Sequence, residues 1–214
     1  MNHLVIVGRG PFAAAILAVL VGGCAGPGGQ PTSSPGPTAS PEATAEATSS
    51  PTSAPRLTQT FTSTLHGISV SYPEGWTAQA ATEPWTERTF PLSFQVPQAD
   101  FLYDPSLTHN LFLTMGSQPI GDSTPEDWVA EQMASGEGCT ATEPIAVDGA
   151  TGLIGTDACN VAVVTSAGRG FWIQLYTGDE APVGLLDRAW FEEVLASVQL
   201  DPKEAVDTPP SASP

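Results

Sequence analysis

The stretch VAVVTSAGRGFWIQLY, residues 161–176, holds two apolar runs on either side of a short segment that contains two glycines. The runs 161–165 and 171–176 are rich in β-branched and aromatic residues, a composition typical of strands. Residues 167–170 have the chemistry of a turn. The stretch therefore predicts two neighbouring antiparallel strands. We expect that the sheet containing them is mainly antiparallel.

Other predicted strands lie on the N-terminal side of this hairpin. Ile68, Val70 and Tyr72 alternate with serines, and residues 90–96 alternate in the same way between apolar and other side chains. This period of two is the pattern of half-buried strands. Pro91 indicates that the second of these strands lies at a sheet edge, because proline cannot donate to a ladder. Segments 111–115 and 152–156 are also predicted to be strands.

Two helices are predicted between and after these strands. The first begins at Thr124, which can cap it, followed by Pro125 and two acidic residues that suit a first turn. The second spans residues 183–197, with apolar residues at helical spacing on one face: Leu186, Trp190, Val194 and Val198. We expect both helices to pack on the sheet and their aromatic residues to belong to the core, which makes the domain α+β.

Aromatic residues define the folded domain within the chain. Every Trp, every Tyr and every Phe except Phe12 lies between Phe61 and Phe191. We therefore predict one globular domain at residues 56–201. Residues 24–55 are almost entirely Pro, Ser, Thr, Ala and Gly, and with the tail 202–214 they are predicted to be disordered because they lack core-forming side chains.

The first residues have the layout of an export signal, with an apolar run from Phe12 to Val21 followed by two glycines. The sequence Leu-Val-Gly-Gly-Cys at 20–24 resembles a bacterial lipobox. That resemblance implies a signal peptide at residues 1–23, a diacylglycerol on Cys24, and a mature chain held by its lipid on the outer face of the bacterial cell membrane. A G-x-G-x-x-A match at Gly8–Ala13 lacks the acidic residue that holds a nucleotide ribose, so no cofactor is expected.

The two cysteines after Cys24 lie in the predicted domain. Cys139 and Cys159 form an even pair, and in an exported chain such a pair indicates a disulfide. A zinc site is the weaker alternative, because neither cysteine has a Cys or His neighbour at ligand spacing.

The charge excludes one class of partner. Asp and Glu number 23 against 6 Lys and Arg, a formal net charge of -17. Nucleic acid is not an expected partner, because binding to phosphates needs clustered basic residues. The acidic residues are scattered, so they are interpreted as a solvated surface.

Motifs for catalysis are absent from the sequence. It contains no G-x-S-x-G, H-x-H or H-E-x-x-H pattern, and His66 and His109 stand apart from other candidate groups. No catalytic or metal-binding residue is therefore assigned. Two alternatives stay open: an envelope hydrolase whose residues meet only in the fold, and an accessory substrate-binding lipoprotein of a transporter.

A long predicted loop between Pro97 and Asn110 is the main candidate for a partner-binding site. Within it Phe101 and Tyr103 alternate with Asp100 and Asp104, and exposed aromatics on a rigid scaffold are suited to binding. The alternative is that both aromatics fold back and cover the core. Residues 83–88, which include Trp85, are a second candidate of the same kind.

Four segments together carry a resemblance to a known family: GISVSYPEGW at 67–76, VDGATG at 147–152, GRGFW at 168–172, and residues 190–200. They resemble the PsbP-like domain of extrinsic photosystem proteins and small bacterial lipoproteins. The resemblance implies an α/β/α sandwich with a central, mainly antiparallel sheet. It also implies a non-catalytic binding or assembly role, with an unidentified envelope protein or small ligand as partner.

We predict that Cys24 is acylated, because an apolar run followed by Gly-Gly-Cys and a long polar tether suits lipid anchoring. Mass spectrometry of the mature protein is expected to show an N-terminal Cys24 with two or three acyl chains. The Cys24→Ser protein is expected to leave the membrane fraction. An intact Met1, or equal membrane attachment of the variant, contradicts the prediction.

Overall fold

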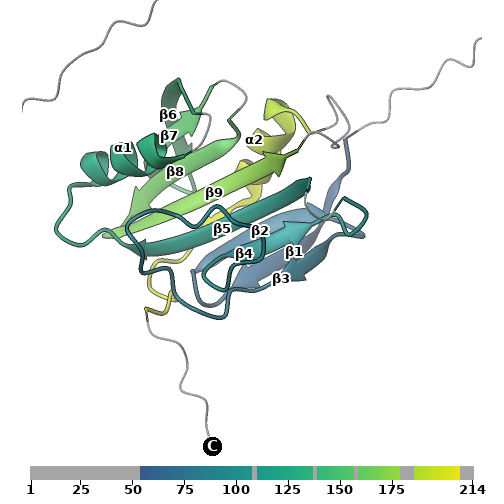
Figure 1. Ribbon diagram of the computed structural model, residues 1–214, viewed down its shortest axis with the longest axis horizontal. Helices are drawn as coiled ribbons and strands as arrows, with labels where there is room; N and C mark the ends of the chain where they lie inside the picture. Colours follow the sequence, from purple (N-terminus) through teal and green to yellow (C-terminus); the bar gives the residue numbers. More distant parts are fainter. Residues whose placement is uncertain (1–53, 108–109, 137–138, 157–158, 179–185, 208–214) are drawn as a thin grey trace, which may run out of the picture. The chain divides into compact units, whose positions relative to one another are not determined.

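The computed structural model describes residues 54–107, 110–136, 139–156, 159–178 and 186–207, all within the compact unit Ser49–Pro214. Ten strands and two helices are assigned in these ranges (Figure 1). In chain order they are β1 (Leu57–Ser63), β2 (Ile68–Pro73), β3 (Thr77–Gln79), β4 (Asp100–Tyr103), β5 (Leu111–Pro119), α1 (Pro125–Ser135), β6 (Thr142–Val147), β7 (Ala150–Gly155), β8 (Val161–Ser166), β9 (Arg169–Thr177), α2 (Arg188–Ser197) and β10 (Gln199–Leu200).

The strands form two sheets, and all of their pairs are antiparallel. The larger sheet has seven strands in the order β3-β4-β5-β9-β8-β7-β6, and the smaller has the order β1-β2-β10. The hairpin β8–β9 at the middle of the larger sheet turns at Ala167 and Gly168, which both have positive φ. The fold is therefore α+β with antiparallel sheets, as the sequence predicts.

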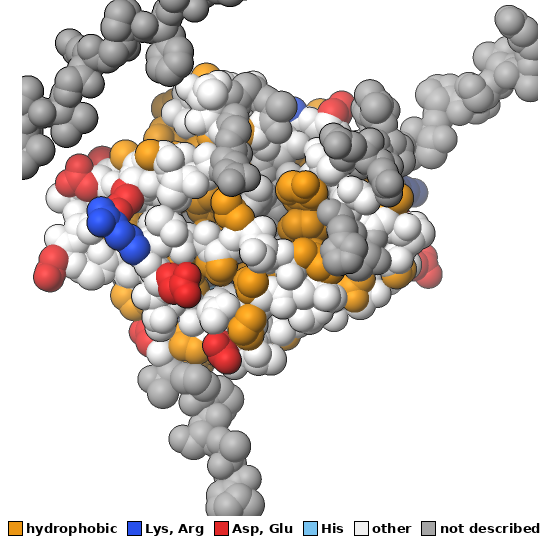
Figure 2. All heavy atoms as spheres, in the orientation of Figure 1, with side chains coloured by type: hydrophobic (Ala, Val, Ile, Leu, Met, Phe, Trp, Pro, Cys, Tyr) orange, Lys and Arg blue, Asp and Glu red, His pale blue; other side chains and the backbone are white. Residues whose placement is uncertain are grey.

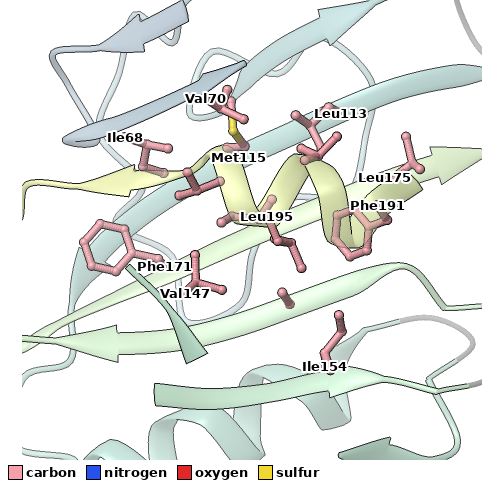
Figure 3. Packing of buried hydrophobic residues seen from close by; sticks show 14 of the residues in the cluster. Ile68, Val70, Leu113, Met115, Val147, Ile154, Phe171, Leu175, Phe191 and Leu195 are labelled. Atoms are coloured by element: carbon pink, nitrogen blue, oxygen red, sulfur yellow. The ribbon is translucent and has the colours of Figure 1, made fainter. Parts of the chain in front are cut away.

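The central strands β5, β8 and β9 are buried on both faces. On one face, Leu113 and Leu175 pack with residues of α2 and β2 (Figure 3). On the other face, Phe112 and Trp172 pack with α1 and with the irregular segment 80–99 between β3 and β4. The two helices thus cover opposite faces of the seven-stranded sheet, which is an α/β/α arrangement.

The face under α1 is covered largely by aromatic rings that lie over glycines. A Cβ on Gly170 would meet three ring carbons of Trp128 at 2.3 to 2.5 Å, and one on Gly116 would meet Phe90 at 2.6 Å. Phe90 also stacks on Trp172, with ring centroids 5.1 Å apart. Glycine is required at these two positions because any side chain would displace the ring that covers it.

The predicted edge strand at 90–96 is wrong. Residues 89–96 form no strand, and Gln95 has a positive φ of 58° that breaks the extended backbone. Phe90, Phe94 and Val96 of this segment pack against the core on this face of the sheet, whereas Leu92 is exposed. An irregular segment that packs on a sheet can therefore show the same alternation of apolar and polar residues as a strand.

The second helix begins later than predicted. Asp187 is its N-cap and its side chain accepts a hydrogen bond from the Trp190 N–H at 3.0 Å, so the helix starts at Arg188. Leu186, Trp190, Val194 and Val198 are all buried, as expected of its apolar face. Residues 183–185 of the predicted helix lie outside the described residues.

The structure joins Cys139 and Cys159 in a disulfide, in agreement with the interpretation of the cysteine count. Their Cα atoms are 5.1 Å apart, within the usual range for a disulfide. The bond connects the segment after α1 to the segment between β7 and β8, and so ties the helix to the sheet that it covers.

The predicted boundary of the C-terminal tail at residue 202 is too early. The Val206 N–H donates to the Leu65 carbonyl at 2.9 Å, and Asp207 pairs with Arg169 at 2.7 Å. Residues 202–207 are therefore held against the domain. Cys24, the signal, most of the predicted stalk and residues 208–214 lie outside the described residues. No helix in the described ranges combines the length and the apolar character that a membrane span needs.

We predict that Gly170→Ala destabilises the domain by about 1–3 kcal/mol, the usual cost of overpacking, because the new methyl group displaces Trp128. Urea denaturation measures the change. In a Trp128→Leu background the same substitution is expected to cost much less, since contacting residues couple in a double-mutant cycle. Equal costs in both backgrounds would show that the Trp128 contact is not the cause.

Candidate functional site

The prediction that the aromatic residues between Pro97 and Asn110 lie in a loop is wrong. Asp100–Tyr103 is strand β4, paired with β3 on one side and β5 on the other. Phe101 is only 1% exposed and packs in the core under α1. The alternative interpretation, in which the aromatics cover the core, is therefore correct for Phe101.

The other members of the predicted site have separate environments. Asp100 is fully buried on the opposite face of the sheet from Phe101. Asp104 is half-buried, and its Oδ1 accepts hydrogen bonds from the N–H and the hydroxyl of Ser106, which closes a local turn. Trp85, the second candidate, is buried, and its Nε1 donates to the Thr89 carbonyl at 3.1 Å. These residues do not form one surface.

Tyr103 does belong to a group of aromatics that reaches the surface. Tyr103 on β4 pairs with Phe112 on β5, and Phe112 pairs with Tyr176 on β9. The rings of Phe112 and Tyr176 are stacked with centroids 4.8 Å apart. Phe94 from the irregular segment packs against Phe112 at 5.0 Å and against Tyr103 at 5.5 Å. We call these four residues the aromatic ladder.

The aromatic ladder is covered unevenly. Phe112 is buried, Phe94 and Tyr103 are half-buried, and Tyr176 is 42% exposed. Within the described part of the chain, the other large exposed hydrophobic residues are Leu92 and Val206. Figure 2 shows the face that carries α1, where hydrophobic side chains gather toward the middle and right and most acidic side chains lie toward the left and lower margins.

Among the described residues, the strand neighbours of the aromatic ladder on the same face of the sheet carry no charge. Thr77 lies opposite Tyr103 on β3, and Gln174 is two residues before Tyr176 on β9. Gln79, opposite Phe101, accepts a hydrogen bond at 3.0 Å from the side chain of the exposed Gln95. An aromatic surface bordered by amides and a hydroxyl is suited to binding an uncharged, hydrogen-bonding partner.

His66 is the one histidine among the described residues, and it is fully buried. The Ser117 N–H donates to its Nδ1 at 3.1 Å, which requires the proton to lie on Nε2, 3.0 Å from the Gln98 carbonyl. Burial lowers the pKa of His66 to about 4, against the opposing effect of these backbone hydrogen bonds. Both nitrogens are used internally, so His66 is not placed to act as a base on a substrate.

Arg169 and Ser117 continue this buried polar cluster. Nε of Arg169 donates to Oγ of Ser117 at 2.8 Å, and that hydroxyl donates to the His66 carbonyl at 2.7 Å. The Arg169 side chain is buried except for its contact with the exposed Asp207. The cluster therefore joins the C-terminal segment to the end of β5 and has a structural role.

Asp100 is the other titratable group with a shifted pKa. Its Oδ1 accepts a hydrogen bond from the Ala81 N–H at 2.8 Å, while its Oδ2 has no hydrogen-bond partner. Burial raises the pKa of Asp100 to about 6, although the Ala81 N–H and the Ser63 side chain act in the opposite direction.

A hollow of about 450 Å³ beside β2 and β10 is lined by polar residues that include Asp148, Asp201 and Glu204. A groove of about 290 Å³ between α1 and the strands β6 to β8 is lined mainly by apolar residues and threonines, including Val129 and Leu153. Within the described ranges, no three His, Cys, Asp or Glu residues are grouped so that they could hold a metal ion.

No family model and no curated protein matches the chain. Two solved structures are similar to it. The solution structure of cyanobacterial PsbP (CyanoP) from Synechocystis sp. PCC 6803 is 16% identical over 67% of this chain and 92% of that chain, with a TM-score of 0.42. A crystal structure from Bacteroides thetaiotaomicron VPI-5482 is 11% identical over 69% of this chain and 50% of that chain, with a TM-score of 0.41. These values assign no residue a role.

We predict that Asp100→Asn changes how stability depends on pH. The folded pKa of about 6 lies above the ordinary value of 3.8, so the buried carboxyl stabilises the fold only while it is protonated. That contribution is complete below about pH 4 and is lost as pH rises through 6. The stability of the variant relative to wild type should therefore rise by about 2 kcal/mol between pH 4 and pH 7. Urea denaturation across this range measures it, and a constant difference contradicts the assignment.

Proposed function

We propose that this chain is an exported lipoprotein, anchored by lipid on Cys24, whose folded domain is a non-catalytic binding or assembly module. Its binding surface is the exposed part of the aromatic ladder: Phe94, Tyr103 and Tyr176. The observation that carries this proposal is that these rings reach solvent while remaining fixed by ring contacts and strand register.

A rigid aromatic surface is favourable for binding because little side-chain freedom is lost when a partner covers it. Tyr176 is fixed by its stacking on Phe112, which is itself buried. Tyrosine also combines a large apolar ring with a polar hydroxyl, a combination enriched in binding sites. The exposed area of Tyr176 is thus available without rearrangement of the sheet.

The titratable groups support binding rather than catalysis. Catalytic acids and bases with shifted pKa values normally face a cleft. His66 and Asp100, whose pKa values are shifted, lie inside the protein, and the aromatic ladder faces the other side of the sheet. Neither of these two groups therefore supplies the hydrolase alternative with an accessible base.

The start of the folded domain suits display on a tether. The Trp190 Nε1–H donates to the Pro55 carbonyl at 2.9 Å, which fixes the chain next to α2 just before β1 begins at Leu57. The predicted Pro/Ser/Thr/Ala stalk joins the domain at this point. A domain attached in this way is expected to search a volume above the membrane rather than keep one orientation.

We predict that the mature chain carrying Cys24→Ser is retained by isolated cell envelopes through the aromatic ladder. Adding Tyr103→Ala and Tyr176→Ala should lower retention about 10-fold, since each removes a ring that a partner would cover. Sedimentation of envelopes with the labelled protein measures retention. Val206→Ala, another exposed apolar residue, is the matched control and should bind as the parent does. Equal retention of all three proteins would remove the aromatic ladder from the proposal.

A further inference from the structure

We infer that the free edge of strand β1 binds the same edge of a second copy of this chain, so that two small sheets join into one. This inference concerns a surface apart from the aromatic ladder and goes beyond the proposed binding function. It is carried by three properties of the described residues: the direction of the β1 backbone groups, the composition of the strand, and the charges near its two ends.

Strand β1 is outermost in the small sheet, and β2 is its one neighbour among the described strands. On β2 the Ser71 N–H donates to Oγ of Ser197 at 3.0 Å, on the side where β10 pairs with β2. Thr60 lies opposite Ser71, and opposed residues of an antiparallel pair point their backbone groups either toward each other or both away. Thr60, and by alternation Thr62, therefore direct their backbone groups away from β2. The Thr62 and Ser69 hydroxyls are 2.8 Å apart, as expected of such a non-hydrogen-bonded pair.

Strand β1 lacks the features that protect the other sheet edges. The seven-stranded sheet ends at β3, which has three residues, and at β6, which contains Glu143 and Pro144. At the other edge of the small sheet, β10 has two residues. Short strands, charges and proline all disfavour pairing with another chain. The seven residues of β1 include no charged residue and no proline, and Thr58, Thr60 and Thr62 are exposed.

The strand can pair with itself in one antiparallel register. Thr58 is the extra residue of a bulge at the start of β1, and the rest of the strand is regular. A two-fold axis at Phe61 places Thr60 of each copy opposite Thr62 of the other, and each pair exchanges both N–H···O bonds. A shifted register would need Thr58 or Thr64, and Thr64 lies beyond the strand. The two-fold symmetry usual in homodimers is thus compatible with this edge.

The same register covers a partly exposed aromatic ring. Phe61 is half-buried and packs against the core beneath α2 and β2. At the axis it lies opposite Phe61 of the second copy in a non-hydrogen-bonded pair, in which Cα atoms are about 4.5 Å apart and side chains are close. Aromatic pairs at such positions stabilise antiparallel strands. The joint therefore combines backbone hydrogen bonds with an apolar contact.

The charges near the two ends of β1 are complementary. Arg56, just before the strand, is exposed and forms no ion pair with another described residue. The hollow at the other end of the strand is lined by Thr64 and by the acidic Asp148, Asp201 and Glu204. Antiparallel pairing places Arg56 of each copy beside this end of the other. The net charge of -17 makes the copies repel each other, but salt screens that repulsion beyond about 8 Å at physiological ionic strength, whereas these charges meet at contact.

Disulfide trapping in the mature Cys24→Ser chain tests the register. Thr60→Cys and Thr62→Cys chains, mixed and gently oxidised, should form a linked heterodimer, because the paired Cα atoms would be about 5.5 Å apart. Either chain alone should link little, since identical positions lie on a diagonal of roughly 7–8 Å. A mixture of Thr60→Cys with Ser123→Cys, an exposed position before α1, controls for random collision and should not link.

Sedimentation equilibrium measures the dimer without a cross-link. Few hydrogen bonds hold the joint, so we expect a weak dimer in dilute solution, strengthened when copies are tethered to one membrane. Thr60→Lys should weaken self-association about 10-fold by placing like charges across the joint, whereas Thr60→Val should retain it. Arg56→Ala should weaken it about 3-fold at low salt. Arg88→Ala, which removes the same charge from an exposed side chain over the opposite face, is the control.

The inference is overturned if the mixed disulfide does not form, or if each single variant links alone to the same extent. Self-association that Thr60→Lys leaves unchanged also overturns it. Urea denaturation checks that the exposed substitutions leave the fold intact. Both experiments use a chain without lipid and leave the aromatic ladder unaltered. Their failure is therefore distinguishable from failure of the proposed function, which the envelope-retention experiment decides.

Discussion

The fold depends on the burial of both faces of the central strands β5, β8 and β9. Strands that are apolar on both faces must be covered by other elements on each face. The two covering layers differ in structure and composition. One is regular, with α2 and the small sheet β1-β2-β10 supplying aliphatic side chains. The other combines α1 with an irregular segment and consists largely of aromatic rings, which approach the sheet closely because Gly116 and Gly170 leave room for them.

The candidate binding surface arises where the second cover ends. Phe90 and Trp128 cover the middle of the sheet, over Gly116 and Gly170, but the row of Tyr103, Phe112 and Tyr176 lies toward the other end of β9. There Phe94 covers Phe112 and leaves Tyr176 partly exposed. The same cross-strand stacking that stabilises the sheet therefore also presents a fixed aromatic ring to solvent.

Local patterns predicted the elements whose sequence signal is local. The hairpin β8–β9, strand β2 and the cap of α1 at Thr124 were predicted because alternation, turn chemistry and capping act over a few residues. Strand β4 was missed because its polar end, Asp100, is stabilised by the distant Ala81 N–H. The exposure of Tyr176 was not predicted, because the sequence of β9 does not show where the segment that covers it ends. Such features depend on contacts between residues that are far apart in the sequence, so local patterns do not reveal them.

The buried polar groups act in opposite directions on stability, which favours a structural interpretation of both. Neutral His66 becomes costly to bury as pH falls from 6.5 toward 4, because the unfolded chain takes up its proton first. Over much of the same range, Asp100 becomes protonated and its burial becomes less costly. The two effects nearly offset each other, so this pair gives the domain little pH dependence. A pH-sensing role would need the two shifts to act in the same direction.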